Sequence, residues 1–187
     1  MGGGNFDQNG NLVIPIEHEV IREYVGGMAR IRIYGKFGFI DKNGKIVVPP
    51  FSDEAENYRE GGCKVTVNNL VGLVNLKGEW IVGPRYDDGG DFSGGYAYLA
   101  EGGKYGYVDK TGKFVIPLQY SKAKDFNATY GLACVAVNDA WGVIDVRNNL
   151  IVPAVYDNVV ITTDGYICVE KDGKFGLMFI PECDEVQ

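Results

Sequence analysis

The chain has 187 residues, 45% of them hydrophobic and 23% charged, with a net charge of −7 from 18 basic and 25 acidic residues. This apolar content excludes a disordered chain, an acidic chain without a basic run argues against nucleic-acid binding, and no apolar run approaches the roughly 20 residues that span a membrane. Residues 1–6 have neither the basic nor the apolar region of a signal peptide, so we expect a soluble, cytoplasmic protein.

Several residue types recur with one period of about 34 residues, which indicates tandem repeats. The period is 34 residues except for an insertion of two residues near positions 129–130. The recurring glycines are Gly38, Gly72, Gly106, Gly142 and Gly176, and the recurring aromatic residues are Tyr24, Tyr58, Phe92 and Phe126. Prolines recur at nearly the same period, with spacings of 34, 35, 33 and 36 residues, at Pro15, Pro49, Pro84, Pro117 and Pro153.

In chain order, the first predicted strand covers residues 11–15, Asn-Leu-Val-Ile-Pro. Residues 30–34 alternate polar and apolar side chains and predict a strand that we call strand a. Residues 36–40 form strand b around an aromatic–glycine pair, and residues 46–48 form strand c, which a proline ends because it cannot donate to a ladder. Between b and c, the Asp-Lys-Asn-Gly sequence of residues 41–44 predicts a hairpin turn, with the Asp bonding backbone NH groups and Gly accepting positive φ.

The later repeats have the same order of strands and end in a short acidic tail, residues 181–187. The predicted unit boundaries lie near 10–44, 45–78, 79–112, 113–148 and 149–180, within a single repeat domain of residues 1–187. Helical repeats can also have a period of 34 residues. Each unit here contains several glycines and a proline, which cost roughly 1 and 3 kcal/mol inside a helix, so the pattern favours strands.

The pattern resembles the WG-containing (KWG) repeat family of bacterial proteins. The resemblance rests on residues 36–49 and 104–117, on Trp141-Gly142 followed by Val-Ile-Asp, and on residues 174–176. Val71 before Gly72, and the absence of Asp-x-x-Gly after Gly176, depart from the pattern. The resemblance covers nearly the whole chain and implies a repeat module that mediates interactions, with no known catalytic residues.

The predicted fold is all-β, with five three-stranded meander units. The strand at residues 11–15 is of type c and the last strand, residues 175–179, is of type b. Pairing between the chain ends would close a ring, which favours a propeller-like closure. An open β-solenoid is the alternative, because 34 residues are few for a propeller blade and Gly4 with residues 7–10 resembles a further b strand and turn.

No catalytic, cofactor-binding or metal-binding residue is predicted, and the ligand-binding residues are unknown from sequence. Cys63 and Cys168 occupy a slot that holds alanine in other units and are interpreted as packing residues, while Cys134 should point to the opposite face. His18 is interpreted as a corner residue, and one histidine with dispersed cysteines is a poor zinc set. The Asp-Lys-Asn-Gly turn lacks the further ligands of a calcium loop.

The leading functional hypothesis is a non-catalytic scaffold that binds a protein or peptide, with specificity set by the residues that vary between units. The alternative is a glycan- or cell-wall-binding module, suggested by 23 aromatic residues among many carboxylates and amides. A third interpretation is a structural segment of a larger protein. The sequence predicts no cofactor, no nucleic-acid partner and no membrane insertion, and leaves the oligomeric state open.

Overall fold

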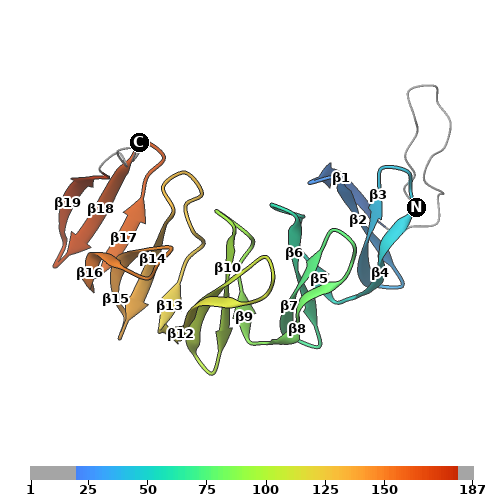
Figure 1. Ribbon diagram of the computed structural model, residues 1–187, viewed down its shortest axis with the longest axis horizontal. Coiled ribbons are helices and arrows are strands. Elements are labelled where there is room, and N and C mark those ends of the chain that lie inside the picture. Colours follow the sequence, from blue (N-terminus) through green and yellow to red (C-terminus); the bar gives the residue numbers. More distant parts are fainter. Residues whose placement is uncertain (1–19, 181–187) are drawn as a thin grey trace. The chain divides into compact units, whose positions relative to one another are not determined.

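The computed structural model describes residues 20–180, which form five small antiparallel sheets (Figure 1). In every sheet, strands that are consecutive in the chain are neighbours. The first sheet contains β1 (Val20–Val25), β2 (Met28–Ile33), β3 (Lys36–Asp41) and β4 (Ile46–Ser52). The second contains β5 (Glu54–Ala55), β6 (Gly62–Val67), β7 (Leu70–Asn75) and β8 (Trp80–Tyr86).

The remaining three sheets continue the same order. The third contains β9 (Asp88–Gly89), β10 (Tyr96–Glu101), β11 (Lys104–Asp109) and β12 (Phe114–Tyr120). The fourth contains β13 (Lys122–Ala123), β14 (Leu132–Val137), β15 (Ala140–Asp145) and β16 (Leu150–Tyr156). The fifth contains β17 (Asn158–Ile161), β18 (Tyr166–Lys171) and β19 (Lys174–Phe179). The sheets therefore repeat at the interval that the sequence predicts.

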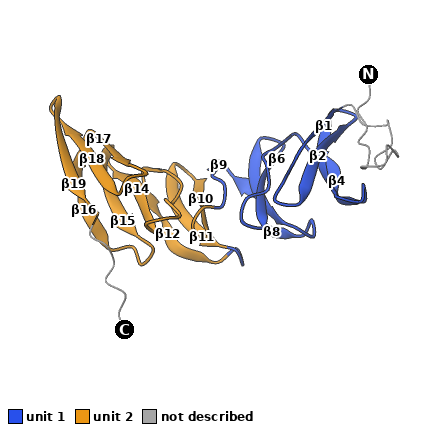
Figure 2. Ribbon diagram, turned by 90° about the horizontal axis from the view of Figure 1, so that it is seen from above, with its two compact units in different colours: residues 1–92, 110–112 blue, residues 93–109, 113–187 orange. Residues whose placement is uncertain are grey.

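Strands a, b and c are present in the first four sheets. The prediction that a proline ends strand c is wrong, because β4 and β12 continue past Pro49 and Pro117; the register shift beside the glycine of strand b accommodates a residue that cannot donate to the ladder. Each sheet adds one strand before strand a. In the second, third and fourth sheets this additional strand has only two residues, as in β5 and β13. Two residues are too few to show an alternation of polar and apolar side chains, so the sequence did not predict this additional strand. The sheets begin at this strand, whereas the predicted unit boundaries lie at the hairpin turns. Contacts divide the chain into two compact units, residues 1–92 with 110–112 and residues 93–109 with 113–187 (Figure 2).

The predicted b–c hairpin turn is confirmed, with the Asp side chain closing it. Asp41 Oδ1 accepts hydrogen bonds from the backbone nitrogens of Asn43 and Lys45, each at 2.9 Å. Gly44 has a φ of 79°, in the region that favours glycine. In the second sheet the Oδ1 of Asn75 accepts the equivalent two bonds, at 2.8 and 3.0 Å. The turn therefore requires a side-chain oxygen at this position and does not require a charge.

The glycine of strand b is required by a close approach of strand c. A Cβ built on Gly38 would lie 2.6 Å from the carbonyl oxygen of Val48, and one on Gly106 would lie 2.6 Å from that of Ile116. The b–c ladder shifts register on both sides of the following residue, as the pairing of β11 with β12 shows. The recurring glycine therefore permits the close approach of strand c and lies beside a bulge in the b–c ladder.

Within each compact unit the core lies between consecutive sheets, where the recurring aromatic residues pack. Phe39 of β3 and Tyr58 of the β5–β6 loop meet edge to face, with ring centroids 4.7 Å apart. Tyr107 of β11 and Phe126 form the equivalent pair, also at 4.7 Å. Cys63 is buried in the cluster that contains Phe39 and Tyr58, as its alanine-like slot predicts. The prediction that Cys168 occupies the same slot is wrong by one residue: Ile167 fills it, and Cys168, which is half-buried, pairs with Leu177 as Cys134 pairs with Val143. Trp141 of the literal Trp-Gly is half-buried against the cluster between the fourth and fifth sheets.

Several sequence predictions fall outside residues 20–180, the part of the chain that the structure describes. They concern the strand at residues 11–15 and its pairing with the last strands, the degenerate strand and turn at residues 4–10, His18, Cys183 and the acidic tail at residues 181–187.

Candidate functional site

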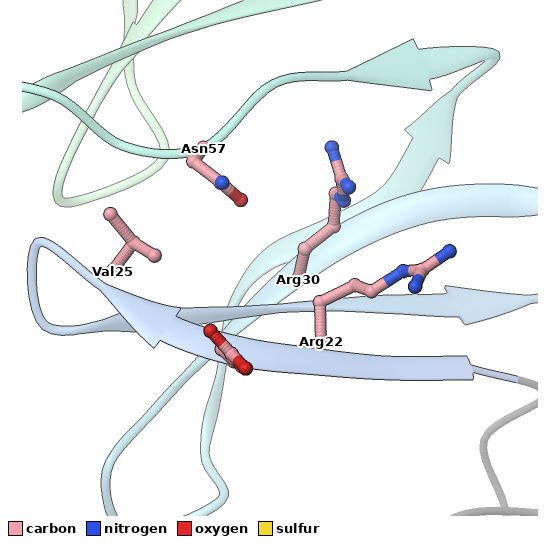
Figure 3. A pocket seen from close by; sticks show the side chains of 5 residues that line it. Arg22, Val25, Arg30 and Asn57 are labelled. Carbon is pink, nitrogen blue, oxygen red and sulfur yellow. The ribbon is translucent and has the colours of Figure 1, made fainter.

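A pocket of about 280 Å³ lies where the first sheet faces the loop between β5 and β6. Its lining residues are Arg22, Glu23 and Val25 from β1, Arg30 from β2, and Asn57 from the loop. Figure 3 shows the Arg22 and Arg30 side chains extending from the two strands, with Asn57 approaching from the loop. The pocket lies entirely within the first compact unit.

A bulge in β1 explains why neighbouring residues of one strand line the same pocket. Ile21 pairs with Ile31 and Tyr24 pairs with Ala29, so β1 contains one residue more than β2 between these pairs. In a regular strand, Arg22 and Glu23 would point to opposite faces. A bulge re-aims side chains locally, and here both residues reach the pocket.

The Arg30 guanidinium contacts neighbouring residues but has no ion-pair partner among residues 20–180. Its Nη1 donates to the carbonyl oxygen of Ala55, and its Cζ lies 5.5 Å from the ring centroid of Phe37. Its Nε is buried and has no hydrogen-bond partner within the described part of the chain. A buried guanidinium nitrogen without a hydrogen-bond partner is costly, and a carboxylate is the group that the planar donors of arginine fit best.

The pocket therefore combines two guanidinium groups with one carboxylate. Arg22 is exposed, Arg30 is half-buried, and neither has an ion-pair partner among residues 20–180. Glu23 supplies one negative charge, and Asn57 supplies an amide that can donate or accept. The arrangement can hold an anionic group such as a carboxylate beside the two arginines.

Asp91 is a second buried ionisable group in the first compact unit. Its Oδ2 lies 3.3 Å from the Nε of Arg59, and its Oδ1 is buried without a hydrogen-bond partner among the described residues. Burial, followed by the charge of Glu56, raises the pKa of Asp91, and Arg59 and Lys64 oppose that shift. The Asp91 carboxylate therefore already has a cation beside it, unlike the guanidinium of Arg30.

Cys63 is the most buried thiol of the described residues, and it lies in a structural environment. Burial, followed by the charge of Asp91, raises the pKa of Cys63 far above its ordinary value. Its Sγ donates to the carbonyl oxygens of Glu56 at 3.1 Å and Lys64 at 3.2 Å. Because the thiolate is the nucleophilic form, this thiol is poorly suited to covalent chemistry at neutral pH.

The residues that the sequence singled out are dispersed over the sheets and do not form one site. Cys134 is buried although it points away from the Ala133 face, because both faces of β14 are covered. Asp41 serves as a turn residue. The described residues contain no group of three or more His, Cys, Asp and Glu side chains placed to hold a metal ion.

The recurring aromatic residues, on which the glycan alternative partly depended, are mostly core residues. Tyr58, Phe92 and Phe126 are buried, and the OH of Tyr58 donates to the carbonyl oxygen of Asn75 at 2.9 Å. Tyr24, the first of the series, is partly exposed. These three buried rings cannot stack on a sugar, whereas Tyr34 at a turn is almost fully exposed.

The Arg22–Arg30 pocket was not predictable from the repeat pattern. The two arginines are not repeated in the other units, and the β1 bulge that brings them together has no sequence signal. The available signal was a cationic strand, Arg30-Ile31-Arg32, within an acidic chain.

Consecutive antiparallel sheets with a period of about 34 residues define a β-propeller-like repeat scaffold. The chain belongs to the WG containing repeat family, whose model matches residues 4–37, 37–70, 72–105, 105–139 and 141–175. This confirms the resemblance seen in the sequence. A search of curated proteins finds no significant match. No helix in residues 20–180 is long and apolar enough to cross a membrane.

Solved structures of low sequence identity share the fold. A eukaryotic initiation factor superposes with a TM-score of 0.54 at 10% identity, covering 87% of this chain and 51% of that one. Kluyveromyces lactis Hsv2, a β-propeller, superposes with a TM-score of 0.50 at 11% identity, covering 82% of this chain and 56% of that one. The chain thus spans little more than half the length of these structures. At such identities the likeness shows the fold alone.

Proposed function

We propose that the chain is a non-catalytic scaffold that binds a protein partner, and that the pocket on the first sheet receives a carboxylate of that partner. The observation that carries the proposal is the pair Arg22 and Arg30, which line one pocket without an ion-pair partner among the residues described. An Asp or Glu side chain, or a C-terminal carboxylate, would supply the missing counter-charge.

The scaffold suits such a role because each repeat is fixed by the same turns and close approaches while its exposed residues differ. The Arg22–Arg30 pair occurs only in the first sheet, so it distinguishes that sheet from the others.

The test is a selection from a random peptide library displayed on phage, with the full chain as bait. We expect the selected peptides to contain Asp, Glu or a free C-terminal carboxylate, and to bind more weakly as salt is raised. Arg22→Gln, at an exposed position, and Arg22→Gln with Arg30→Gln should lower the affinity at least tenfold. Arg147→Gln, at an exposed arginine of a hairpin turn, is the matched control and should leave binding unchanged.

Selected peptides without carboxylates, or with an affinity insensitive to both arginine variants, would overturn the assignment of the pocket. If no peptide is selected while a panel of soluble glycans binds the chain, the protein-binding proposal itself fails and the glycan alternative takes its place.

A further inference from the structure

The last sheet lacks strand c in the part of the chain that the structure describes. β19 pairs with β18, and its other edge has no strand beside it within residues 20–180. It nevertheless retains the glycine whose purpose elsewhere is to admit strand c. A Cβ on Gly176 would meet only Val169 Cγ2, at 3.0 Å, whereas one on Gly38 or Gly106 would meet a strand c carbonyl. A cleft of about 340 Å³ lies beside Gly176.

The face of β19 that would receive a following sheet is also uncovered. Leu177 is 63% exposed, although the residues at the same repeat position are almost completely buried. Those residues are Phe39, Leu73, Tyr107 and Val143. Phe175 and Phe179, two positions away on either side, are also exposed, so β19 presents three large apolar side chains on one face.

The other end of the array carries the complementary features. Residues 11–15, Asn-Leu-Val-Ile-Pro, match the strand c sequence Asn-Leu-Ile-Val-Pro of residues 149–153. The first sheet already has its strand c, β4, so residues 11–15 are not needed there. Tyr24 is 38% exposed, whereas Tyr58 at the equivalent position is 1% exposed and packs on Phe39 of the preceding sheet.

We propose that copies of this chain associate head to tail, with residues 11–15 of one copy forming the fourth strand on β19 of the next. The pattern of apolar residues supports this register. The residue before the proline is buried in three of the four existing c strands, as Val48, Ile116 and Val152 are, and Ile14 occupies that position in the segment. The Tyr24 ring would then cover Leu177 as Tyr58 covers Phe39.

The spacing along the chain allows both contacts to form together. Pro15 precedes Tyr24 by nine positions, just as Pro49 precedes Tyr58 and Pro117 precedes Phe126. The contact is heterologous, because the two copies use different surfaces, so it generates rings or open chains rather than closed twofold dimers. It is separate from the carboxylate pocket and does not depend on the function proposed for that pocket.

The test is sedimentation velocity of the full chain over a range of concentrations. We expect species at multiples of the 20.5 kDa monomer mass, increasing with concentration. Leu177→Asp changes an exposed residue of the receiving face, and Ile14→Asp changes the inserted segment. Each variant alone should remain monomeric. Leu150→Asp, at a 54% exposed position of β16, is the matched control and should associate as the original chain does.

Mixing the two variants provides the decisive measurement. Ile14→Asp retains an intact receiving face and Leu177→Asp retains an intact segment, so the mixture should form a 1:1 complex and nothing larger. A chain that is monomeric at every concentration, or variants that associate alone as well as the original chain does, would overturn the proposal. Circular dichroism of each variant checks that its strands are retained.

Discussion

The carbonyl oxygen of Ile116 occupies the place where a side chain on Gly106 would begin, 2.6 Å from the position of its Cβ. The same relationship joins Gly38 to Val48 in the first sheet. The recurring glycine is therefore a steric requirement of the b–c ladder. The φ of Gly106 is not in the left-handed region, so a larger residue there is disfavoured by steric clash with strand c and not by backbone strain.

Replacing Gly106 with valine should therefore destabilise the protein. Either the b–c ladder or the backbone of β12 must move, and overpacking of this kind costs about 1–3 kcal/mol. For a chain of this size each kcal/mol lowers the thermal unfolding midpoint by about 2–4 °C, so we expect a fall of about 2–12 °C. Gly83→Val is the matched control, because a Cβ there meets nothing within 4 Å. Equal midpoints for the two variants would contradict the steric role of Gly106.

Phe126→Ala should cost more than Trp141→Ala, although tryptophan is the larger residue. Phe126 is buried and packs against Tyr107, so replacing it with alanine leaves a cavity and should lower the free energy of unfolding by about 3–5 kcal/mol. Trp141 is half-buried and lies 4.8 Å from the Nζ of Lys124, so we expect a loss of about 1–2 kcal/mol. Urea denaturation measures both changes. The reverse order would show that Trp141 contributes more to the core than its exposure suggests.

The Asp41 turn should make the free energy of unfolding decrease at acidic pH. The backbone hydrogen bond from Lys45 lowers the pKa of Asp41 below its ordinary value. The stabilisation is therefore complete above the unfolded pKa of about 3.9 and is lost as the pH falls through the lower folded pKa. Asp41→Asn keeps the accepting oxygen, as Asn75 does in the second sheet, but cannot titrate.

Thermal unfolding between pH 2 and pH 5 measures this effect. The midpoint of the original chain should fall more steeply with acid than that of Asp41→Asn. Parallel curves would mean that Asp41 titrates alike in the folded and unfolded states.

Cys63 should resist thiol reagents in the folded protein. It is buried and its pKa is raised by burial, so little thiolate is available at pH 7. We expect a thiol-specific label, located by peptide mass spectrometry, to modify Cys63 at least tenfold more slowly than the half-buried Cys168, and the difference to disappear in urea. Cys63→Ala, the residue found at Ala29 and Ala97, should fold with nearly unchanged stability. Rapid labelling of native Cys63 would indicate opening of the second sheet.

Much of the fold was predictable because the repeated residues are required by the local backbone geometry. Asp41 closes a turn and Gly106 admits a carbonyl, and such requirements leave the same residue at each repeat. The two-residue strands, such as β5, were not predictable. Their pairing follows from the path of the corner before strand a, and two residues show no alternation of their own.

The pocket was less accessible from sequence for a different reason. Arg22 and Arg30 meet because β1 contains a bulge, and a single extra residue in an edge strand leaves no compositional trace. The partial exposure of Trp141 was also hidden, since the sequence identifies its repeat position but not how completely the neighbouring sheet covers it.

Every ladder among the described residues joins strands that are consecutive in the chain. Such local pairing keeps the entropy cost of closing each loop small, so folding should start within one meander and spread to its neighbours. Because each sheet pairs only its own strands, the genetic gain or loss of one 34-residue repeat leaves the strand pairing of the other sheets unchanged. Arrays of different length can therefore arise by duplication while each existing sheet keeps its own hydrogen bonds.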